Sequence, residues 1–268
     1  MKRNILVVGA VAVLAACGVS TQQEVELGTQ YAQQINAQLP IVSDPEVNRY
    51  INVLGDSIAK LSDERNLEWR FYIVDSREVN AFAVPGGFIY VNRGLIERSR
   101  NLSMLAGVLG HEIGHVIERH SVEQMQKMQQ AQLGVGLACV LTRICQNQAT
   151  GTLIDIAGTA VFAKFSRDDE READAVGIQY VTRAGIDPRG IPAMFRVLLD
   201  ERNRQSSAVD GWFSTHPLEE ERIAETEAMI KQIDVAILET LTTDSQNYQE
   251  FKRRVMALPP PPATRAGP

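Results

Sequence analysis

The sequence predicts an α+β protein that is mainly helical and contains a small β-sheet. Apolar residues recur at helical spacing over several long segments, for example at Val47, Ile51 and Leu54. Aromatic and β-branched residues gather in one short region, residues 68–91. The 268 residues are 44% hydrophobic and 22% charged, which is typical of a globular protein with one domain of ordinary size. We therefore expect a small sheet packed against a helical body.

The first sixteen residues are expected to be a bacterial lipoprotein signal and not part of the fold. Lys2 and Arg3 precede an apolar run from Ile5 to Ala16, which at about twelve residues is too short to span a bilayer. The run leads into Cys17 through Leu-Ala-Ala, which resembles the lipobox whose cysteine is acylated. A plain signal peptide or an uncleaved anchor is the alternative. Gly18 is not the aspartate that commonly retains lipoproteins at the inner membrane, so we expect the outer membrane, with the protein facing the periplasm.

The remaining chain divides into three parts by composition. We expect a polar tether at residues 17–23, the folded domain at residues 24–257, and a tail at residues 258–268 that contains consecutive prolines and does not pack. The formal net charge of −6 gives no reason to expect a nucleic-acid partner, since such proteins usually carry a basic patch.

The elements of the domain follow from periodicity and from start and stop signals. The sequence Ser43-Asp44-Pro45 predicts a helix start, with a capping residue and a proline at the first helical position. Pro85-Gly86-Gly87 predicts a turn between two strands. Strands are expected at residues 68–74, 80–84 and 88–91, and helices at residues 24–39, 45–61, 102–130, 169–184, 188–204 and 218–240.

Residues 132–163 contain two apolar stretches that are each shorter than a membrane span. We expect a buried helical hairpin here, and a mobile lid or a membrane-touching flap over the site is the alternative. Cys139 and Cys145 lie in this region, and an oxidising periplasm permits a disulfide between them. Six residues on one helix point the two side chains apart, so a disulfide requires a turn; two buried thiols are the alternative.

The strongest chemical signal is an HExxH motif formed by His111, Glu112 and His115. On a helix, the two histidines lie on one face, one turn apart, and can bind the same metal ion. Glu112 is turned about 100° from His111, beside that ion, and can take a proton from a water whose pKa zinc lowers to about 7. The motif therefore predicts one Zn²⁺ per chain, and a coincidental pair on a surface helix is the alternative.

A catalytic zinc site has three protein ligands and one open position, so a third ligand must come from elsewhere. Glu170 and Asp174 are four residues apart and share one helix face. Glu170 is a candidate ligand, and Asp174 is a candidate for orienting a ligand histidine through its second ring nitrogen. From the residues alone, an acidic and solvated helix start is an equal alternative, because negative charge there is favoured by the helix dipole.

The HExxH motif and the later pattern Ser-Arg-x-x-Glu-x-x-Ala-Asp at residues 166–174 are together similar to the M48 metallopeptidase family, especially its lipid-anchored periplasmic members. The similarity extends from about Glu24 to Ile233. It also includes the segments Asn80-Ala81-Phe82-Ala83, Pro85-Gly86-Gly87 and Ser214-Thr215-His216-Pro217, together with Arg222. The implied fold is an α+β zincin with its active-site cleft between the sheet and the helices.

The resemblance also implies a role for each site residue. The implied zinc ligands are His111, His115 and Glu170. Glu112 is the implied general base, and Asp174 the implied supporting residue or proton donor.

Further residues have roles that the resemblance leaves open. His216 is implied to lie near the metal, either as a donor that stabilises the oxyanion or as a plug in the open position; a helix-capping loop histidine is the alternative. Arg222 is a second candidate for the oxyanion charge. His120, about 140° from His115 on a continuous helix, is off the metal face, and we interpret it as structural.

The segment Asn80-Ala81-Phe82-Ala83 is expected to form an edge strand that pairs with the substrate backbone, a mode of binding with little sequence preference. An ordinary core strand is the alternative.

These features predict a zinc-dependent endopeptidase of the bacterial envelope. The family resemblance implies that its substrates are misfolded or stalled envelope proteins and that it acts in quality control. The outer-membrane assembly machinery is a further expected partner. The rival hypothesis is a chaperone-like lipoprotein that binds outer-membrane clients with little proteolysis. A purely structural lipoprotein would leave the whole motif unexplained.

Overall fold

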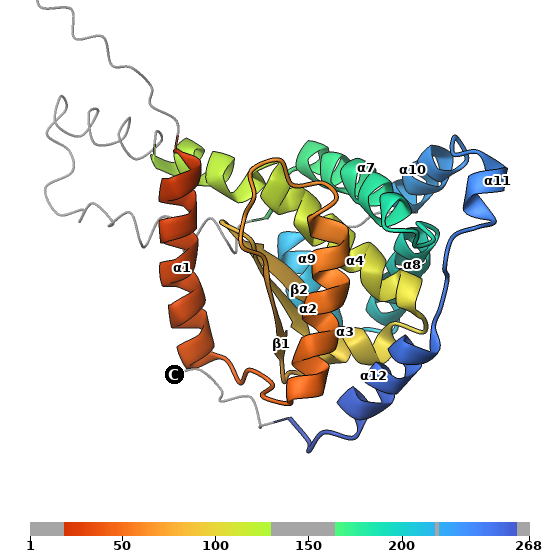
Figure 1. The fold of residues 1–268 in the computed structure, drawn as a ribbon, viewed down its shortest axis with the longest axis horizontal. Helices are drawn as coiled ribbons and strands as arrows, with labels where there is room; N and C mark the ends of the chain where they lie inside the picture. Colours follow the sequence, from red (N-terminus) through yellow and green to blue (C-terminus); the bar gives the residue numbers. More distant parts are fainter. Residues whose placement is uncertain (1–18, 130–163, 218–219, 262–268) are drawn as a thin grey trace, which may run out of the picture.

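A computed structural model describes residues 19–129, 164–217 and 220–261 of the chain. In these residues, helices surround a small three-stranded sheet (Figure 1). The predicted α+β class, mainly helical with a small sheet, is confirmed. The elements are α1 (Thr21–Gln38), α2 (Pro45–Ala59), β1 (Arg70–Val74), β2 (Ala81–Val84), β3 (Phe88–Asn92), α3 (Arg93–Arg98), α4 (Leu102–Ile117), α7 (Arg167–Arg183), α8 (Gly190–Asn203), the 3₁₀ helix η1 (Ser207–Val209), α9 (Asp210–Thr215), α10 (Glu220–Ile230), α11 (Val235–Leu238) and α12 (Gln246–Met256).

The sheet has the strand order β1-β3-β2, so that β2 lies at one edge among the described strands. β1 and β3 are parallel, whereas β2 and β3 are antiparallel and form a hairpin. The turn of this hairpin contains Gly86 and Gly87, whose φ angles are 84° and 100°. Residues other than glycine rarely adopt such φ angles, which explains why glycine occupies both positions of the predicted turn.

Alternation along the strands gives the sheet two apolar faces, each covered by different helices. The first face packs into the main core with α2 and α4, and its residues are Phe71, Ile73, Ala81, Ala83, Ile89 and Val91. The second face packs under α1 and the helical segment 120–129, and its residues are Tyr72, Val74, Phe82, Val84, Phe88 and Tyr90. In Figure 1, α1 and α2 lie on opposite sides of the strands. The helix α4, which carries the HExxH motif, is therefore a buried core helix.

The first two helices begin at capping residues. α1 starts at Thr21, three residues before the expected start, because Ser20 and Gln23 form a capping box. α2 starts at Pro45 as predicted, with the Asp44 side chain accepting two backbone hydrogen bonds. It ends at Ala59, so the expected helix at residues 45–61 is two residues too long, and Leu61 beyond its end is 53% exposed.

The long helix predicted for residues 102–130 is wrong, because the helix is interrupted. α4 ends at Ile117, and helical structure resumes at His120. Between them, Arg119 adopts a left-handed conformation with a φ of 62°, which no continuous α-helix accommodates. The helix predicted for residues 218–240 is likewise divided into α10 and α11, because the Asp234 side chain caps a new helix start.

α4 and α7 pack at unusually close range, and this contact places the two halves of the site together. A Cβ atom built on Gly177 of α7 would lie 3.1 Å from the backbone of Gly110 and of His111 on α4. Small residues at this crossing therefore allow the two backbones to approach. The approach brings the start of α7, with Glu170, next to the HExxH motif.

Near the C-terminus, Leu258 still packs against the main core, and the carbonyl oxygens of Leu258 and Pro259 accept hydrogen bonds from Arg93. Packing thus continues past the expected start of the tail at Leu258. The predicted signal at residues 1–16, Cys17, the apolar stretches of residues 132–163 with both later cysteines, and residues 262–268 lie outside the described residues.

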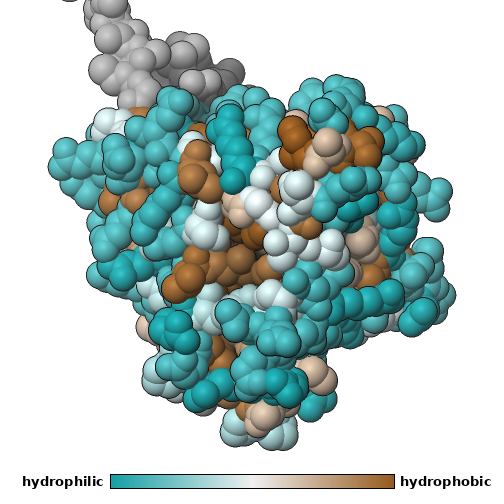
Figure 2. Space-filling view, turned by 45° about the vertical axis from the view of Figure 1, so that its right-hand side comes forward, coloured by the Kyte–Doolittle hydropathy of each residue, from teal (hydrophilic) through white to brown (hydrophobic). Residues whose placement is uncertain are grey.

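The surface in Figure 2 is mostly hydrophilic, with apolar side chains gathered in a central hollow of this face. Among the described helices, none combines the length and apolar character that crossing a bilayer requires.

Candidate metal centre

The predicted site residues come from four parts of the fold and meet in one buried cluster. α4 supplies His111, Glu112 and His115, and α7 supplies Glu170 and Asp174. His216 follows α9, and Arg222 lies on α10. All seven side chains are buried. The structure therefore brings together residues that are separated by more than a hundred positions in the sequence.

Four of these residues direct a possible ligand atom toward a common point: His111, His115, Glu170 and His216. Their ligand atoms all lie within 4.8 Å of one another. The two Nε2 atoms of His111 and His115 are 3.1 Å apart. Glu170 Oε2 lies 3.6 Å from His111 Nε2, and Glu170 Oε1 lies 3.4 Å from His115 Nε2.

These separations match a tetrahedral metal site. Ligands at bond lengths of about 2.0–2.1 Å in a tetrahedron are about 3.3 Å apart, close to the separations between His111, His115 and Glu170. Glu112 adds a second indication, since both of its carboxylate oxygens are buried without a hydrogen-bond partner. A buried carboxylate without partners is costly in a purely structural role. The donor set therefore fits a metal ion with a reactive carboxylate beside it.

Asp174 lies beside the second ring nitrogen of His111, and Arg222 binds Asp174 in turn. The Nδ1 atom of His111 lies 2.8 Å from Asp174 Oδ1, although the direction of the ring N–H does not satisfy hydrogen-bond geometry. The two atoms are nevertheless within contact distance, so the carboxylate of Asp174 faces this ring nitrogen. Arg222 in turn donates to both oxygens of Asp174, from Nε at 2.9 Å and from Nη2 at 2.8 Å. This bidentate contact fixes the Asp174 carboxylate that faces His111.

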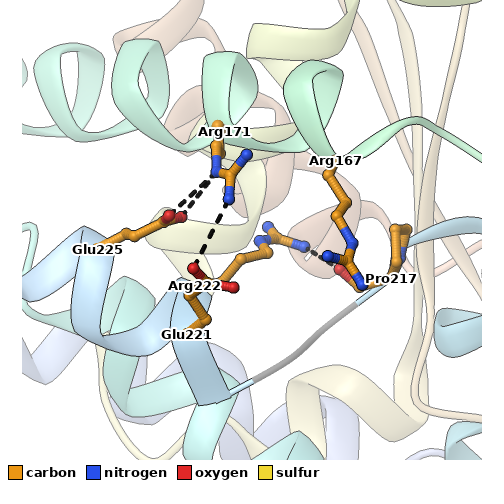
Figure 3. Close-up of a pocket in the computed structure, with 6 residues that line it drawn as sticks. All are labelled: Arg167, Arg171, Pro217, Glu221, Arg222 and Glu225. Carbon is orange, nitrogen blue, oxygen red and sulfur yellow. Dashed lines mark hydrogen bonds and ion pairs between the residues drawn. The ribbon is translucent and has the colours of Figure 1, made fainter.

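Arg222 also contacts the other side of the site. Its Nη1 atom donates to Glu170 and to the carbonyl oxygen of Pro217, the residue after His216. Figure 3 shows Arg222 between α7 and α10, at a hollow where Arg171 contacts Glu221 and Glu225. The volume of this hollow is about 10 Å³. This hollow is too small for a peptide side chain. The contacts of Arg222 are those of a residue that positions Asp174 and Glu170.

His216 lies between two carboxylates and against an aromatic ring. Its Nδ1 atom lies 2.9 Å from Glu170 Oε1 and 3.4 Å from His111 Nε2. Its Nε2 atom lies 3.5 Å from Glu112 Oε1. Trp212 stacks on the imidazole, with ring centroids 4.6 Å apart. The loop histidine is therefore part of the cluster and not an isolated helix cap.

Burial and neighbouring charges set the ionisation of the cluster. Burial raises the pKa of Glu112, although the nearby His216 and His111 partly oppose this. Burial would also raise the pKa of Glu170, but the charge of His216 and the hydrogen bond with His115 outweigh it and hold this pKa well below its usual value. Burial holds the pKa of His115 well below its usual value, so this imidazole is neutral, as a metal ligand must be.

The ionisation of His216 follows the opposite balance. Burial would lower the pKa of His216, but the carboxylates of Glu170 and Glu112 more than offset it and raise the pKa. The shifts of His216 and Glu170 together favour an ion pair between them.

β2 runs beside α4 and brings Ala83 to the site. The backbone of Ala83 is close enough to Glu112 to favour its charged form, although the contact does not satisfy full hydrogen-bond geometry. The side chains of Ala81, Phe82 and Ala83 are buried. The backbone of Asn80 pairs with that of Asn92. The segment Asn80-Ala81-Phe82-Ala83 is thus next to the metal cluster and at one edge of the described sheet.

Sequence reasoning missed three contributors to the site. Phe165 stacks on His115 with ring centroids 4.0 Å apart, and Trp212 stacks on His216. Both aromatic residues are buried and pack against imidazoles of the cluster. His120 was placed away from the metal on the assumption of a continuous helix, but its Nδ1 atom lies 2.8 Å from His115 Nδ1. No glycine or proline marks the helix break that makes this contact, so the sequence offered no local signal for it.

Comparison with known proteins supports the interpretation of this cluster as the metal site of a peptidase. The sequence profile of Peptidase family M48 matches residues 45–230. The chain is 32% identical to the beta-barrel assembly-enhancing protease of Escherichia coli (strain K12) over 253 residues, which is 91% of this chain and 50% of the relative. The protein of the same name from Yersinia pestis is 31% identical over the same shares of both chains.

A more distant relative is the mitochondrial metalloendopeptidase OMA1 of Arabidopsis thaliana, which is 32% identical over 59% of this chain and 31% of its own length. The chain spans about half the length of the bacterial relatives it matches.

Proposed function

The chain belongs to peptidase family M48, and on this premise we propose that it is a zinc-dependent endopeptidase of the bacterial envelope that cleaves misfolded or stalled envelope proteins. One observation carries the proposal: Glu112 is a buried carboxylate without hydrogen-bond partners, beside a cluster whose His111, His115 and Glu170 have the spacing of a tetrahedral metal site. That arrangement is suited to activating water next to a metal ion.

We assign the metal ligands as His111, His115 and Glu170. Two imidazole nitrogens and one carboxylate oxygen form a donor set typical of catalytic zinc in peptidases. When bound, zinc supplies a Lewis acid for the scissile carbonyl and lowers the pKa of water. Asp174 and Arg222 hold His111 and Glu170 in place through the contacts described above.

In this mechanism Glu112 moves the proton. It accepts a proton from the attacking water and returns it to the leaving amine. Burial supports this role, because it raises the pKa of Glu112 and so strengthens it as a base. The dry surroundings formed by Phe165 and Trp212 strengthen each electrostatic interaction in the site.

We assign His216 the role of a plug that occupies the fourth ligand position in the resting enzyme. Its Nδ1 atom has the spacing of a ligand toward Glu170 and His111, at 2.9 and 3.4 Å. The ion pair with Glu170 describes the site without a metal; bound zinc would favour the neutral form of His216, because a ligand imidazole must be deprotonated. A neutral imidazole in this place would displace the water that Glu112 needs. A donor to the oxyanion is the rival role. Arg222 is less suited to the oxyanion, because Asp174, Glu170 and Pro217 engage its guanidinium.

For the substrate, we propose that an extended polypeptide adds to the β2 edge of the sheet beside Ala83. Backbone pairing has little sequence preference and suits varied unfolded clients. The beta-barrel assembly-enhancing protease bears a name that links it to outer-membrane β-barrel assembly. We extend to this chain the proposal of a partner in that machinery.

For the location, we propose that Cys17 carries lipid and anchors the chain to the outer membrane on its periplasmic side. The carbonyl oxygen of Val19, two residues later, accepts a hydrogen bond from Arg119, directly after the HExxH helix. The anchor would then hold the active site close to the membrane surface. Mass spectrometry of the processed protein tests this, and an unmodified N-terminus at another residue contradicts it.

The rival, a chaperone-like lipoprotein, predicts no use for Glu112. A binding protein gains nothing from a buried carboxylate without partners, which is destabilising. The test is digestion of casein with and without a chelator, combined with metal analysis of the wild type and of Glu170→Ala. We expect one zinc per chain, digestion that the chelator abolishes, and loss of zinc in the variant. Full zinc occupancy in Glu170→Ala contradicts the ligand assignment, and chelator-resistant binding without digestion favours the chaperone.

A further inference from the structure

His120 is a buried histidine that reaches the metal cluster only because the helix is broken before it. It is 2% exposed, and its Nδ1 atom lies 2.8 Å from His115 Nδ1. On a continuous helix the two side chains would point about 140° apart. The left-handed conformation of Arg119, with a φ of 62°, changes the course of the chain and turns His120 back onto His115.

Partly buried ion pairs to the buried Glu24 hold the break in place. Arg119 donates from Nε to Glu24 Oε2 over 2.8 Å and from Nη2 to the Val19 carbonyl oxygen. Glu24 is itself buried and also accepts from Arg65, which donates to the Val116 carbonyl oxygen at the end of α4. A left-handed arginine is unfavourable unless its surroundings fix it. Contacts with Glu24 of α1 and with Val19, which precedes α1, fix Arg119, so the fold determines the position of His120.

The hydrogen bonds beyond His120 define which ring nitrogens carry protons. Glu172 Oε2 lies 3.2 Å from His120 Nε2. A carboxylate only accepts, so in the neutral imidazole of His120 this contact places the proton on Nε2 and leaves Nδ1 as an acceptor. His115 must then donate from Nδ1. Its Nε2 atom is left with a free lone pair, and this is the atom that faces His111 and Glu170 at 3.1 and 3.4 Å.

We propose that His120, oriented by Glu172, is a positioning residue that fixes the tautomer and ring orientation of His115 and thereby strengthens zinc binding. It touches neither the substrate nor the metal. The arrangement parallels that of His111, whose Nδ1 faces the carboxylate of Asp174 directly. His115 instead reaches its carboxylate through a second imidazole. This inference rests on the proposed zinc site.

The test is the zinc dissociation constant of the full chain, measured by competition with a chromophoric chelator at fixed pH. His120→Leu keeps a bulky side chain at this position but removes Nδ1, the acceptor for His115. We expect zinc affinity to fall about 10–100-fold, as is usual when a partner of a ligand is lost. His120→Asn keeps an acceptor at the δ position, so it should recover most of the affinity. Circular dichroism of the zinc-free proteins checks folding.

A second pair of variants avoids the core. The Glu172 side chain is 57% exposed, so Glu172→Leu leaves the packing intact and should weaken zinc binding in the same direction. Asp168→Leu removes the same charge from the same helix start, where that side chain is 94% exposed, and should leave affinity unchanged.

The outcomes separate the inference from the proposed function. Wild-type affinity in both His120→Leu and Glu172→Leu overturns the inference, as does an equal loss in His120→Asn and His120→Leu, which indicates packing alone. Failure of the wild type to bind zinc overturns the proposed function itself.

Discussion

His216 lies 2.9 Å from Glu170 through its Nδ1 atom, so the loop after α9 places an imidazole directly beside a proposed metal ligand. If His216 is a plug, His216→Ala should raise basal proteolysis of an unfolded substrate, because the fourth position becomes free for water. If it is a donor to the oxyanion, the same change should lower kcat by about 10²–10³-fold. Proteolysis assays with zinc content measured in parallel distinguish the two. We expect faster cleavage, and a fall with zinc retained contradicts the plug.

Arg222 holds the carboxylates of Asp174 and Glu170 in a buried network. Arg222→Met leaves both negative charges without their main partner, so we expect the free energy of unfolding to fall by about 3–5 kcal/mol. Arg222→Lys should not restore it, because lysine cannot donate to both oxygens of Asp174 in the same plane. Urea unfolding of the zinc-free protein measures the effect.

The matched control is Arg171→Met, a second arginine at the same hollow (Figure 3), whose side chain is 41% exposed. Exposed pairs contribute little, so this variant should unfold like the wild type. If Arg171→Met and Arg222→Met lowered the free energy of unfolding equally, the buried network would contribute no more than the exposed ion pairs, which contradicts the prediction.

Gly177 sets the distance between α7 and α4. Intrinsic helix propensity predicts that Gly177→Ala stabilises the protein by about 1 kcal/mol. The added Cβ, however, would lie 3.1 Å from the backbone of Gly110 and of His111. We therefore expect the opposite sign, a loss of about 1–3 kcal/mol in unfolding free energy, as overpacked cores show. Gln179→Ala, at an exposed position of α7, should be neutral or stabilising; a stabilised Gly177→Ala would contradict the close approach.

Much of the fold was predictable because its local signals agree with the final packing. The strands were recognisable from aromatic and β-branched residues, and the Gly86-Gly87 turn from its need for positive φ angles. The start of α2 at Asp44 and Pro45 followed from capping chemistry. The metal cluster was predictable in part, since the spacing of His111 and His115 alone places them on one helix face.

The parts that failed depend on tertiary contacts between distant residues. The break at Arg119 has no glycine or proline signal, and it is held by Glu24, which is 95 residues away in the sequence. His120 was consequently placed on the wrong side of the helix. The proximity of His216 to Glu170 and His111 could not be derived from spacing, and it was expected only from the family resemblance. The contacts of Arg222 likewise arise only when α7 and α10 pack together.

The central claim is that Glu112 activates water beside a metal ion held by other residues. Glu112→Gln keeps the size of the side chain but can neither accept the water proton nor return it. Because the carboxylate of Glu112 makes no hydrogen bond in the structure, the fold should survive the change.

The decisive measurement is zinc content and peptide cleavage by purified Glu112→Gln, with Glu123→Gln, an exposed residue of the following helix, as control. We predict full zinc content in both variants, unchanged cleavage in the control, and a loss of about 10²–10⁴-fold in Glu112→Gln. Near-normal cleavage by zinc-loaded Glu112→Gln would contradict the account.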